Sequence, residues 1–388
     1  MMKNIFIVSK ADIVYGNTAA ATRMNNYAKA LSNKNKIYML SFDKLLDSSE
    51  FIEAKKNIFT IQENKKDNIK IYDIISTIKA VVKFNKLYNG ICGDKYIIYY
   101  PNTNTILFDI ILLLLYRKNL FAEINEVRKF SSEGQTRLVS KIRLYLYSLI
   151  YESTLKFYKG VIYISMNIKL YYKEMNNNNL VIPILSDFNS INTYKKEHVI
   201  GNEGLLFLFT GTVSFAKENL EELIFGFKLF TEKYNNSKLY FYGSITDNNK
   251  NKLLHIISDL DLSDKVKYKG NLDRNDIKYI LAKADCLLLP RNNNKQNYYG
   301  FSTKLAEYAI SGTPIILTNT GVIGDYFKDK ENCLLCEGYN RQSFKDKFIE
   351  FVSLDKNEKI RLSSNALETA RLHFDYRNYS DILDEFIQ

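Results

Sequence analysis

Short apolar runs alternate with longer amphipathic segments along most of this 388-residue chain. The first unit contains the apolar run KNIFIVSK (3–10), a loop around Gly16, a helical pattern through Tyr27 and Leu31, and the run KIYMLSF (36–42). Short apolar runs are typical of buried parallel strands, and a strand, helix and strand in this order favour a right-handed crossover. The pattern therefore predicts an α/β fold. Further strands are expected at 95–100, 119–124 and 160–165, with a long helix over 136–158.

The same order begins again after a polar stretch without periodicity, SDFNSINTYKKEHVIGNEG (186–204). The strand LLFLFT (205–210) is followed by a glycine-containing loop at 211–214 and a helix over 219–234. We interpret the polar stretch as a domain boundary, because two domains suit a chain of this length better than one. Further strands are expected at 238–243, 265–270, 285–290 and 315–318, with helices around 247–260 and over 273–283.

Two such halves predict two Rossmann-like domains, each with a parallel sheet, that face a cleft. In this fold class, ligands bind beyond the carboxyl ends of the strands. We expect an N-terminal domain over 1–186, a C-terminal domain over 187–365, and helices over 366–388 that return to the first domain.

The composition is typical of a soluble globular protein, with 46% hydrophobic and 25% charged residues. The N-terminus lacks the pattern of a secretory signal. The most apolar segment, ILFDIILLLLY (106–116), is shorter than the roughly 20 residues that span a bilayer, and predicts a core helix or one at an interface. Four cysteines fit a reducing setting better than a disulfide framework. We therefore expect a cytoplasmic protein.

The formal net charge of +11 predicts attraction to anions such as phosphates, nucleic acid or an acidic membrane face. A Lys- and Asn-rich composition also follows from genome base bias, so the charge alone does not choose among these partners. The basic, tyrosine-rich segments 136–158 and 170–174 have two interpretations. They form either a surface that contacts an anionic membrane or core helices whose lysine stems cover apolar residues.

The segment GFSTKLAEYAISGTPIILTNTG (300–321) has turn residues on both sides of two short elements. Ser302 or Thr303 can cap a helix that Gly312 ends, and the free amides of its first turn suit a phosphate. Glu307 lies one turn further along and can accept hydrogen bonds from two sugar hydroxyls. The alternative is a capped helix in which Glu307 pairs with Lys304 in solvent.

This segment, with DCLLLP (285–290) before it and ENCLLCEG (331–338) after it, resembles the donor half of the group 1 (family 4) glycosyltransferases. These are retaining enzymes of the two-domain GT-B fold. The family's usual pattern has two glutamates separated by seven residues. Glu307 matches the second, whereas Tyr299 takes the place of the first.

A second matching segment, FTGTVSFAKENLEEL (209–223), is similar to the family's glycine loop, which begins here at Gly211. In relatives an arginine and a lysine of this loop grip the donor diphosphate. Lys217 matches the lysine, and Thr212 stands in place of the arginine. The residues that can compensate for the missing cation are Arg291, Lys295 and Lys304.

Two further segments extend the resemblance. KYKGNL (267–272), with Gly270 and Asn271, is similar to the turn beside the nucleobase. FAEINEVRKF (121–130) is similar to the strand end that faces the acceptor. The remaining residues that the resemblance assigns are Asn125, Glu126 and Arg128 on the acceptor side, with Glu126 among the catalytic residues, and the loop Gly16, Asn17 and Thr18 at the diphosphate.

The resemblance implies a retaining, hexosyltransferase-like enzyme that needs no metal and no cofactor. It would transfer a sugar from a UDP- or GDP-sugar to a glycan or lipid-linked glycan, with no nucleic-acid partner. Capsule or lipopolysaccharide synthesis at the inner face of the cytoplasmic membrane is the expected setting. The alternatives are an epimerase or phosphorylase on the same fold, and a non-catalytic basic nucleic-acid-binding or scaffolding protein.

Other motifs are weak. Cys333 and Cys336 have the spacing of a zinc site but no second pair, and we interpret their segment as a turn. Asp259 and Asp261 are expected at a solvated helix end. The chain has neither a G-x-G-x-x-G fingerprint nor a phosphate-loop GK[ST] motif, which argues against an NAD enzyme and a P-loop NTPase.

Overall fold

The structure, a computed structural model, describes residues 2–10, 12–14, 16, 18–45, 50–61, 74–101, 106–130, 138–188, 204–272 and 274–388. The chain divides into two compact units. The first unit contains Met1–Asp187 and Asp375–Gln388, and the second contains Phe188–Phe374. The C-terminal end of the chain therefore belongs to the first unit.

The first unit is built on an eight-stranded sheet with the order β3-β4-β2-β1-β5-β6-β7-β8. All neighbouring strands are parallel except the β3–β4 pair. Its elements are β1 (Asn4–Ser9), α1 (Ala19–Leu31), β2 (Lys36–Ser41), α2 (Phe42–Leu45), β3 (Phe51–Lys55), β4 (Ile58–Ile61), α3 (Ile74–Gly90), β5 (Lys95–Tyr100), α4 (Ile106–Tyr116), β6 (Leu120–Ile124), α5 (Leu138–Thr154), η2 (Leu155–Phe157), β7 (Gly160–Tyr163), α6 (Met166–Tyr171), β8 (Asn179–Val181), η4 (Tyr376–Tyr379) and α15 (Ser380–Phe386).

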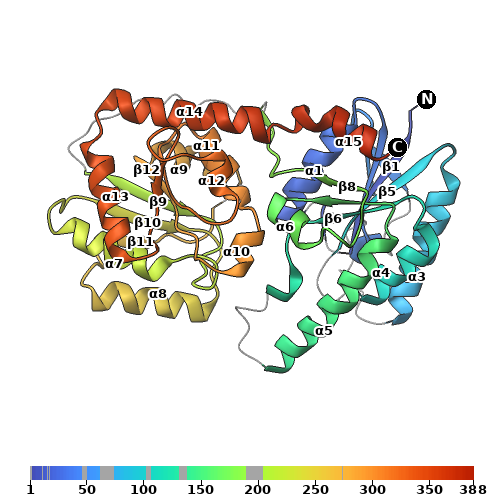
Figure 1. Cartoon of the computed structure of the whole chain (residues 1–388), viewed down its shortest axis with the longest axis horizontal. Helices are drawn as coiled ribbons and strands as arrows, with labels where there is room; N and C mark the ends of the chain where they lie inside the picture. The colour runs from blue at the N-terminus through green and yellow to red at the C-terminus, as the bar shows by residue number, and fades with distance from the viewer. Residues whose placement is uncertain are drawn as a thin grey trace. The chain divides into compact units, whose positions relative to one another are not determined.

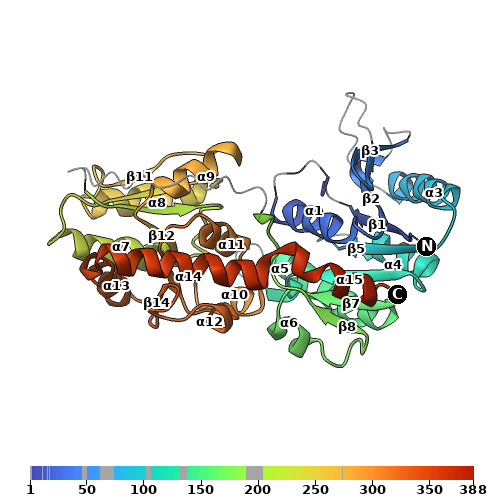
Figure 2. The ribbon, with the colours of Figure 1, turned by 90° about the horizontal axis from the view of Figure 1, so that it is seen from above.

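Helices cover both faces of this sheet because the strand order reverses at β1. The crossover from β1 to β2 runs one way along the sheet, and those from β5 through β8 run the other way. Right-handed crossovers in opposite directions place their helices on opposite faces. Accordingly, α1 and α15 lie over one face, while α3, α4 and α5 lie on the other (Figures 1 and 2).

The second unit repeats this plan with a six-stranded sheet of order β11-β10-β9-β12-β13-β14, in which every pair is parallel. Helices α7, α8 and α13 lie on one face, and α9 and α11 lie on the other (Figure 1). Its elements are β9 (Leu206–Thr210), α7 (Leu220–Thr231), β10 (Lys238–Tyr242), α8 (Asp247–Asp259), β11 (Val266–Tyr268), α9 (Arg274–Lys283), β12 (Cys286–Leu289), α10 (Lys295–Tyr299), α11 (Thr303–Ile310), β13 (Ile315–Thr318), α12 (Ile323–Tyr326), β14 (Leu334–Cys336), α13 (Arg341–Ser353) and α14 (Lys356–Phe374).

The central strands are apolar because both faces of each sheet are covered. Phe207 and Phe209 of β9 are fully buried, and Phe207 packs against the rings of Phe230 and Phe348. In the first unit, every residue of β1 is buried. This packing explains why short apolar runs, rather than alternating ones, identified the strands.

The predicted α/β fold with two parallel sheets is confirmed, and each strand expected from the sequence is present. One interpretation of a turn is wrong: Leu334–Cys336 form β14 beside β13. The β3–β4 hairpin was not expected. Most of the polar stretch 186–204 lies outside the described residues.

Among the helices of the described ranges, none combines the length and the apolar character needed to cross a membrane.

Candidate functional site

The glycine loop of the second unit begins where β9 ends, at Thr210. Gly211 has a φ of 116°, and a Cβ at this position would overlap the side chain of Lys304. Gly243, with a φ of 125°, lies so close that its own Cβ would overlap the carbonyl of Gly211. Only glycine fits either position without displacing a neighbour. The loop therefore lets the lysine side chain pass directly against the backbone.

Helix α11 is fixed to the start of this loop by Tyr308. The buried Tyr308 hydroxyl accepts a hydrogen bond from the Thr210 amide at 2.8 Å and donates to the Thr210 carbonyl at 3.2 Å. Burial, more than any other cause, raises the pKa of Tyr308 well above its ordinary value, so the hydroxyl stays protonated. This contact sets the position of Lys304, which lies one turn earlier on α11.

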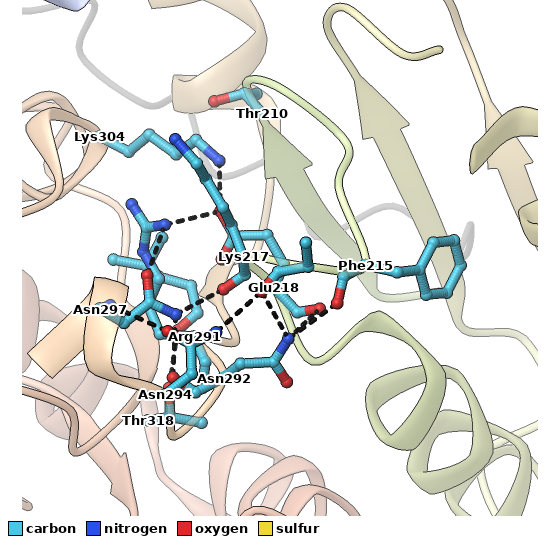
Figure 3. Close-up of polar contacts among 12 residues, drawn as sticks. Thr210, Phe215, Lys217, Glu218, Arg291, Asn292, Asn294, Asn297, Lys304 and Thr318 are labelled. Atoms are coloured by element: carbon cyan, nitrogen blue, oxygen red, sulfur yellow. Dashed lines mark hydrogen bonds and ion pairs between the residues drawn. The ribbon is translucent and has the colours of Figure 1, made fainter. Parts of the chain in front are cut away.

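Glu218 is the centre of a cluster of charged side chains (Figure 3). Its side chain is 1% exposed, and Oε1 accepts from Lys304 Nζ at 2.8 Å and lies 3.3 Å from Arg291 Nη1. Oε2 is buried and has no hydrogen-bond partner in the described parts of the chain. One carboxylate thus holds two cations that come from segments about 70 to 90 residues further along the chain.

Lys304 is the cation most affected by this environment. Burial lowers the pKa of its ammonium to about 8, although the carboxylate of Glu218 opposes the shift. Arg291 and Lys217 act in the same direction as burial, because each adds positive charge nearby. The ammonium also lies 4.1 Å from the centre of the Phe209 ring. The cluster therefore carries an excess of positive charge that a bound anion would relieve.

Lys217 has an exposed side chain and a firmly held backbone. Its carbonyl accepts from the Asn297 side chain at 2.7 Å and from the Asn292 amide at 3.1 Å. Its own amide donates to the Ser214 carbonyl. The loop thus fixes the backbone of Lys217 and leaves its ammonium accessible to solvent.

The Asn-rich composition of RNNNKQN (291–297) predicts a solvent loop, but the structure places this segment against the glycine loop. The Asn292 side chain donates to the carbonyls of Phe215 and Glu218, and the Asn294 side chain donates to the carbonyl of Ala216. Side-chain amides here act as hydrogen-bond donors to the carbonyls of the glycine loop, which has only isolated bridges to its neighbours in the described chain. The close repetition of asparagines in this segment was the sequence feature that could have indicated this role.

Ser302 occupies the position before α11, but the predicted capping hydrogen bond is not made. Its hydroxyl is buried and has no partner among the described residues. Thr303 is the first residue of the helix, and Gly312, with a φ of 72°, follows its end as expected. The helix start therefore keeps a buried hydroxyl and free backbone amides, which suit an oxyanion.

The other predicted donor-side residues are spread around this loop. Glu307 is exposed on α11, and Tyr299 is half-buried at the end of α10. Thr212 is exposed, and its hydroxyl lies 3.1 Å from that of Ser244. Lys295 begins α10 with an exposed side chain, so of the three candidate replacements only Arg291 and Lys304 join the Glu218 cluster.

The turn predicted at the nucleobase follows β11. Gly270 has a φ of 87°, and its carbonyl accepts from the Gly243 amide at 2.8 Å. Asn271 is exposed. Because Gly243 also contacts Gly211, this turn and the glycine loop lie at the same end of the sheet.

In the first unit, Asn125 and Glu126 directly follow β6, as predicted. The Asn125 side chain donates to the Tyr100 hydroxyl at 2.5 Å. Burial first, and then the charges of Glu123 and Glu126, raise the pKa of that hydroxyl well above its ordinary value. Both residues are half-exposed at the carboxyl end of the sheet.

Arg128 differs from these two residues. It is 4% exposed, and its guanidinium lies 3.9 Å from the centre of the Tyr151 ring and 4.9 Å from that of Tyr147. Its contacts therefore support the packing of α5. A cation that binds an acceptor would have to be accessible to solvent, and Arg128 is not.

The loop before α1 is described only in part. A Cβ at Gly16 would come within 2.5 Å of the Asp12 carbonyl, so the position favours glycine. Thr18 caps α1, with its hydroxyl accepting from the Ala21 amide at 3.1 Å. Asn17 lies outside the described residues. The contact of this loop with a diphosphate stays a prediction.

Within the described ranges, no group of three or more metal-ligating side chains comes together. Cys333 and Cys336 are buried, and burial raises the pKa of the Cys336 thiol to about 12. The residues that sequence reasoning missed are Glu218, Tyr308, Asn292, Asn294 and Asn297. Glu218 was visible only as a charged neighbour of Lys217.

Comparison with known proteins agrees with this arrangement. Residues 190–369 match the family model of Glycosyl transferases group 1. No curated protein matches the chain in sequence.

Solved structures are similar over the whole chain. Sucrose-phosphate synthase from Thermosynechococcus elongatus has a TM-score of 0.74 at 12% identity, over 99% of this chain and 98% of that one. HepE of Anabaena in complex with UDP has a TM-score of 0.67 at 15% identity, over 99% of each chain. An E. coli trehalose-6-phosphate protein bound with UDP-2-fluoro glucose has a TM-score of 0.72 at 11% identity, over 99% of each chain. The resemblance inferred from the sequence is confirmed: residues 190–369 match the group 1 glycosyltransferases, and the whole chain has the GT-B fold.

Proposed function

We propose that this protein transfers a sugar from a nucleotide-diphosphate donor, a UDP- or GDP-sugar, to a hydroxyl of a glycan or lipid-linked glycan. One observation carries the proposal: Arg291 and Lys304 converge on the single carboxylate of Glu218 beside Lys217. This excess of positive charge suits a diphosphate. HepE, which has the same fold, is in complex with UDP.

The chemistry follows from where charge develops. When the bond between the sugar and the diphosphate breaks, negative charge grows on the leaving diphosphate. Fixed cations and free amides near that charge lower the barrier, because they are already oriented before the reaction begins. Lys217 and the start of α11 at Ser302 supply them here. Arg291 and Lys304 take the place of the arginine that Thr212 replaces.

Glu218 keeps this site ordered before the donor arrives. Arg291 and Lys304 would repel each other without a carboxylate between them. The buried Glu218 fixes both cations through Oε1. A diphosphate would then share Lys304 and Arg291 with Glu218. The exposed carboxylate of Glu307 would orient the ribose through its two hydroxyls.

The finer assignments rest on the family resemblance. The second unit would bind the donor, and the first would bind the acceptor through Asn125 and Glu126. The transfer would be hexosyl transfer with retention of configuration and without an obligatory metal. Capsule or lipopolysaccharide synthesis at the inner face of the cytoplasmic membrane is the setting that we propose.

A donor screen tests the function. The full-length protein is mixed with a panel of UDP- and GDP-sugars, and thermal stabilisation, donor hydrolysis and the anomeric configuration of any product are measured. Lys217→Ala should abolish turnover with unchanged folding, whereas Lys250→Ala, which removes an exposed lysine of α8, should not.

Each outcome of the screen is informative. Normal turnover by Lys217→Ala would contradict the assignment of the site. An inverted product would overturn the retaining mechanism. Formation of an epimerised sugar nucleotide, or of a sugar phosphate from a glycan and phosphate, in place of donor hydrolysis or transfer would favour an epimerase or phosphorylase. Salt-dependent binding of RNA or DNA, with no stabilisation by any nucleotide sugar, would favour the non-catalytic alternative.

A further inference from the structure

Helices α3, α4 and α5 of the first unit expose large apolar side chains on their outer faces. Leu114 is 77% exposed, Leu138 71%, Ile75 66% and Val82 64%. Scattered exposed apolar residues are normal on a soluble protein, but a concentration of them on neighbouring helices marks an interaction surface. The other members of this surface, which we call the apolar face, are Ile78, Leu107, Ile110, Leu115, Ile142, Tyr145, Leu146, Leu149 and Ile150.

The three helices are neighbours, so the apolar face is continuous. The Tyr116 hydroxyl of α4 donates to the Asn85 side chain of α3 at 2.9 Å, and its ring packs on Phe84. The Tyr147 hydroxyl of α5 donates to the Asp109 carboxylate of α4 at 3.0 Å. The helices follow one another along one side of the sheet (Figure 1). Their polar contacts point inward, and their apolar side chains point outward.

The charges of this region have one sign. The two carboxylates of these helices are turned inward: Asp109 is 2% exposed, and the Glu152 side chain is 12% exposed and faces Lys129. The exposed charged side chains in and directly after α3 and α4, within the described ranges, are Lys79, Lys86, Arg117 and Lys118. Among the described residues, the apolar face therefore has these basic neighbours, and α3, α4 and α5 themselves have no exposed carboxylate.

We propose that the apolar face is a docking surface for an anionic lipid bilayer. Apolar side chains of an interfacial helix enter the boundary between headgroups and acyl chains, while lysine and arginine contact anionic headgroups. A second copy of the chain fits less well. A two-fold interface would place the same basic residues opposite each other, with no exposed carboxylate of these helices to neutralise them.

This inference goes beyond the proposed transfer reaction and does not depend on it. The surface belongs to the first unit alone, whereas the Glu218 cluster belongs to the second. If the protein bound no nucleotide sugar, docking to the bilayer would still be expected. If docking failed, donor binding would be unaffected.

Vesicle co-sedimentation of the full-length protein tests the proposal. We expect binding to vesicles of phosphatidylglycerol and phosphatidylcholine, weaker binding to phosphatidylcholine alone, and partial loss of binding at high salt. The double variant Leu114→Glu, Leu146→Glu should reduce binding by about tenfold or more, because two carboxylates would enter the interface.

The matched control is Leu254→Glu, which changes a 47% exposed leucine of α8 in the second unit and should leave binding unchanged. Thermal unfolding and UDP-sugar binding of all variants show that each is folded. Equal loss in both variants, or no vesicle binding by the folded wild type, would overturn the proposal. Analytical ultracentrifugation without lipid tests the alternative occupant. A dimer that Leu114→Glu dissociates would show that the apolar face binds a second copy of the chain and not a bilayer.

Discussion

Each unit of this protein contains a carboxylate whose side chain is at most 1% exposed and is paired with a cation, but the two pairs are built differently. Glu123, near the end of β6, pairs with Arg23 of α1 at 2.6 Å. Glu218, in the loop after β9, pairs with Lys304 at 2.8 Å and with Arg291 at 3.3 Å. Each carboxylate has one buried oxygen without a partner in the described chain. The two sites differ in the surroundings of their cations.

Arg23 is enclosed and satisfied. Its side chain is 2% exposed, and it also donates to the carbonyl of Ile182 at 2.7 Å and to the Tyr27 hydroxyl at 2.9 Å. Burial acts to lower the pKa of Arg23, but the Glu123 carboxylate, together with Tyr27 and Tyr100, outweighs burial and the pKa is raised. One charge meets one charge, so this pair joins α1 to the sheet and has no capacity for a ligand.

The Glu218 cluster has more cations than anions, and they are not fully enclosed. The side chains of Lys304 and Arg291 are each 14% exposed, and Lys217 is exposed beside them. Burial lowers the pKa of Lys304 to about 8, in contrast to Arg23. A balanced, closed pair is structural, and an unbalanced, open one is prepared for an anion.

The largest expected effect is on the closed pair. Glu123→Gln should lower the free energy of unfolding by about 3–5 kcal/mol, because arginine cannot lose its proton and stays as an uncompensated buried charge. Urea denaturation of the variant and the wild type measures this difference. A loss below about 1 kcal/mol would mean that the pair is not the attachment of α1 that we describe.

The same substitution in the open cluster should cost less. Glu218→Gln removes a charged hydrogen-bond acceptor, for which we expect a loss of about 2 kcal/mol at pH 6.5. Without the carboxylate, the pKa of Lys304 falls further, so the folded variant releases this proton at lower pH than the folded wild type. The loss should therefore shrink by about 1 kcal/mol between pH 6.5 and pH 9.

The Glu123→Gln variant provides the control for this pH dependence. Its cost should be the same at both pH values, because Arg23 does not titrate in this range. A parallel pH dependence in the two variants would show that Lys304 is not responsible.

Nucleotide binding should show the titration of Lys304 directly. The affinity for UDP should fall by up to about tenfold, or 1.4 kcal/mol, as the pH rises from 7 to 9, since only the protonated amine attracts the diphosphate. In the absence of ligand, the unfolded chain binds this proton more tightly, so the free energy of unfolding should rise from about pH 8 towards 10.5. Calorimetric titration of Lys304→Arg should show a flat affinity profile.

The smallest effect is expected at the position where relatives have an arginine. Thr212→Arg should change the affinity for UDP by less than about threefold, or 0.7 kcal/mol, because Arg291 and Lys304 already supply the cations. A gain of about tenfold or more in the same titration would show instead that the site lacks a cation.

The sequence predicted the fold to a large extent because the covered strands are continuous apolar runs. The strands β1, β5, β9 and β13 were visible in this way. Strands β8 and β14 were missed because an Asn-rich run and a Cys-x-x-Cys spacing indicated turns there, whereas the equally short edge strand β11 was predicted. For the site, the family's spacing predicts Lys217 and Glu307 as well as the glycine loop, and their roles stay predictions.

Only the tertiary structure decided which charges meet. The sequence left Arg291, Lys295 and Lys304 equal as replacements for the missing arginine, and it did not indicate Glu218 at all. The contact of Lys304 with Glu218 joins residues 86 positions apart and depends on a glycine at 211 and on the hydrogen bonds of Tyr308. Local patterns record burial and periodicity along the chain, whereas the balance of charge at a site depends on which side chains the fold brings within a few ångströms.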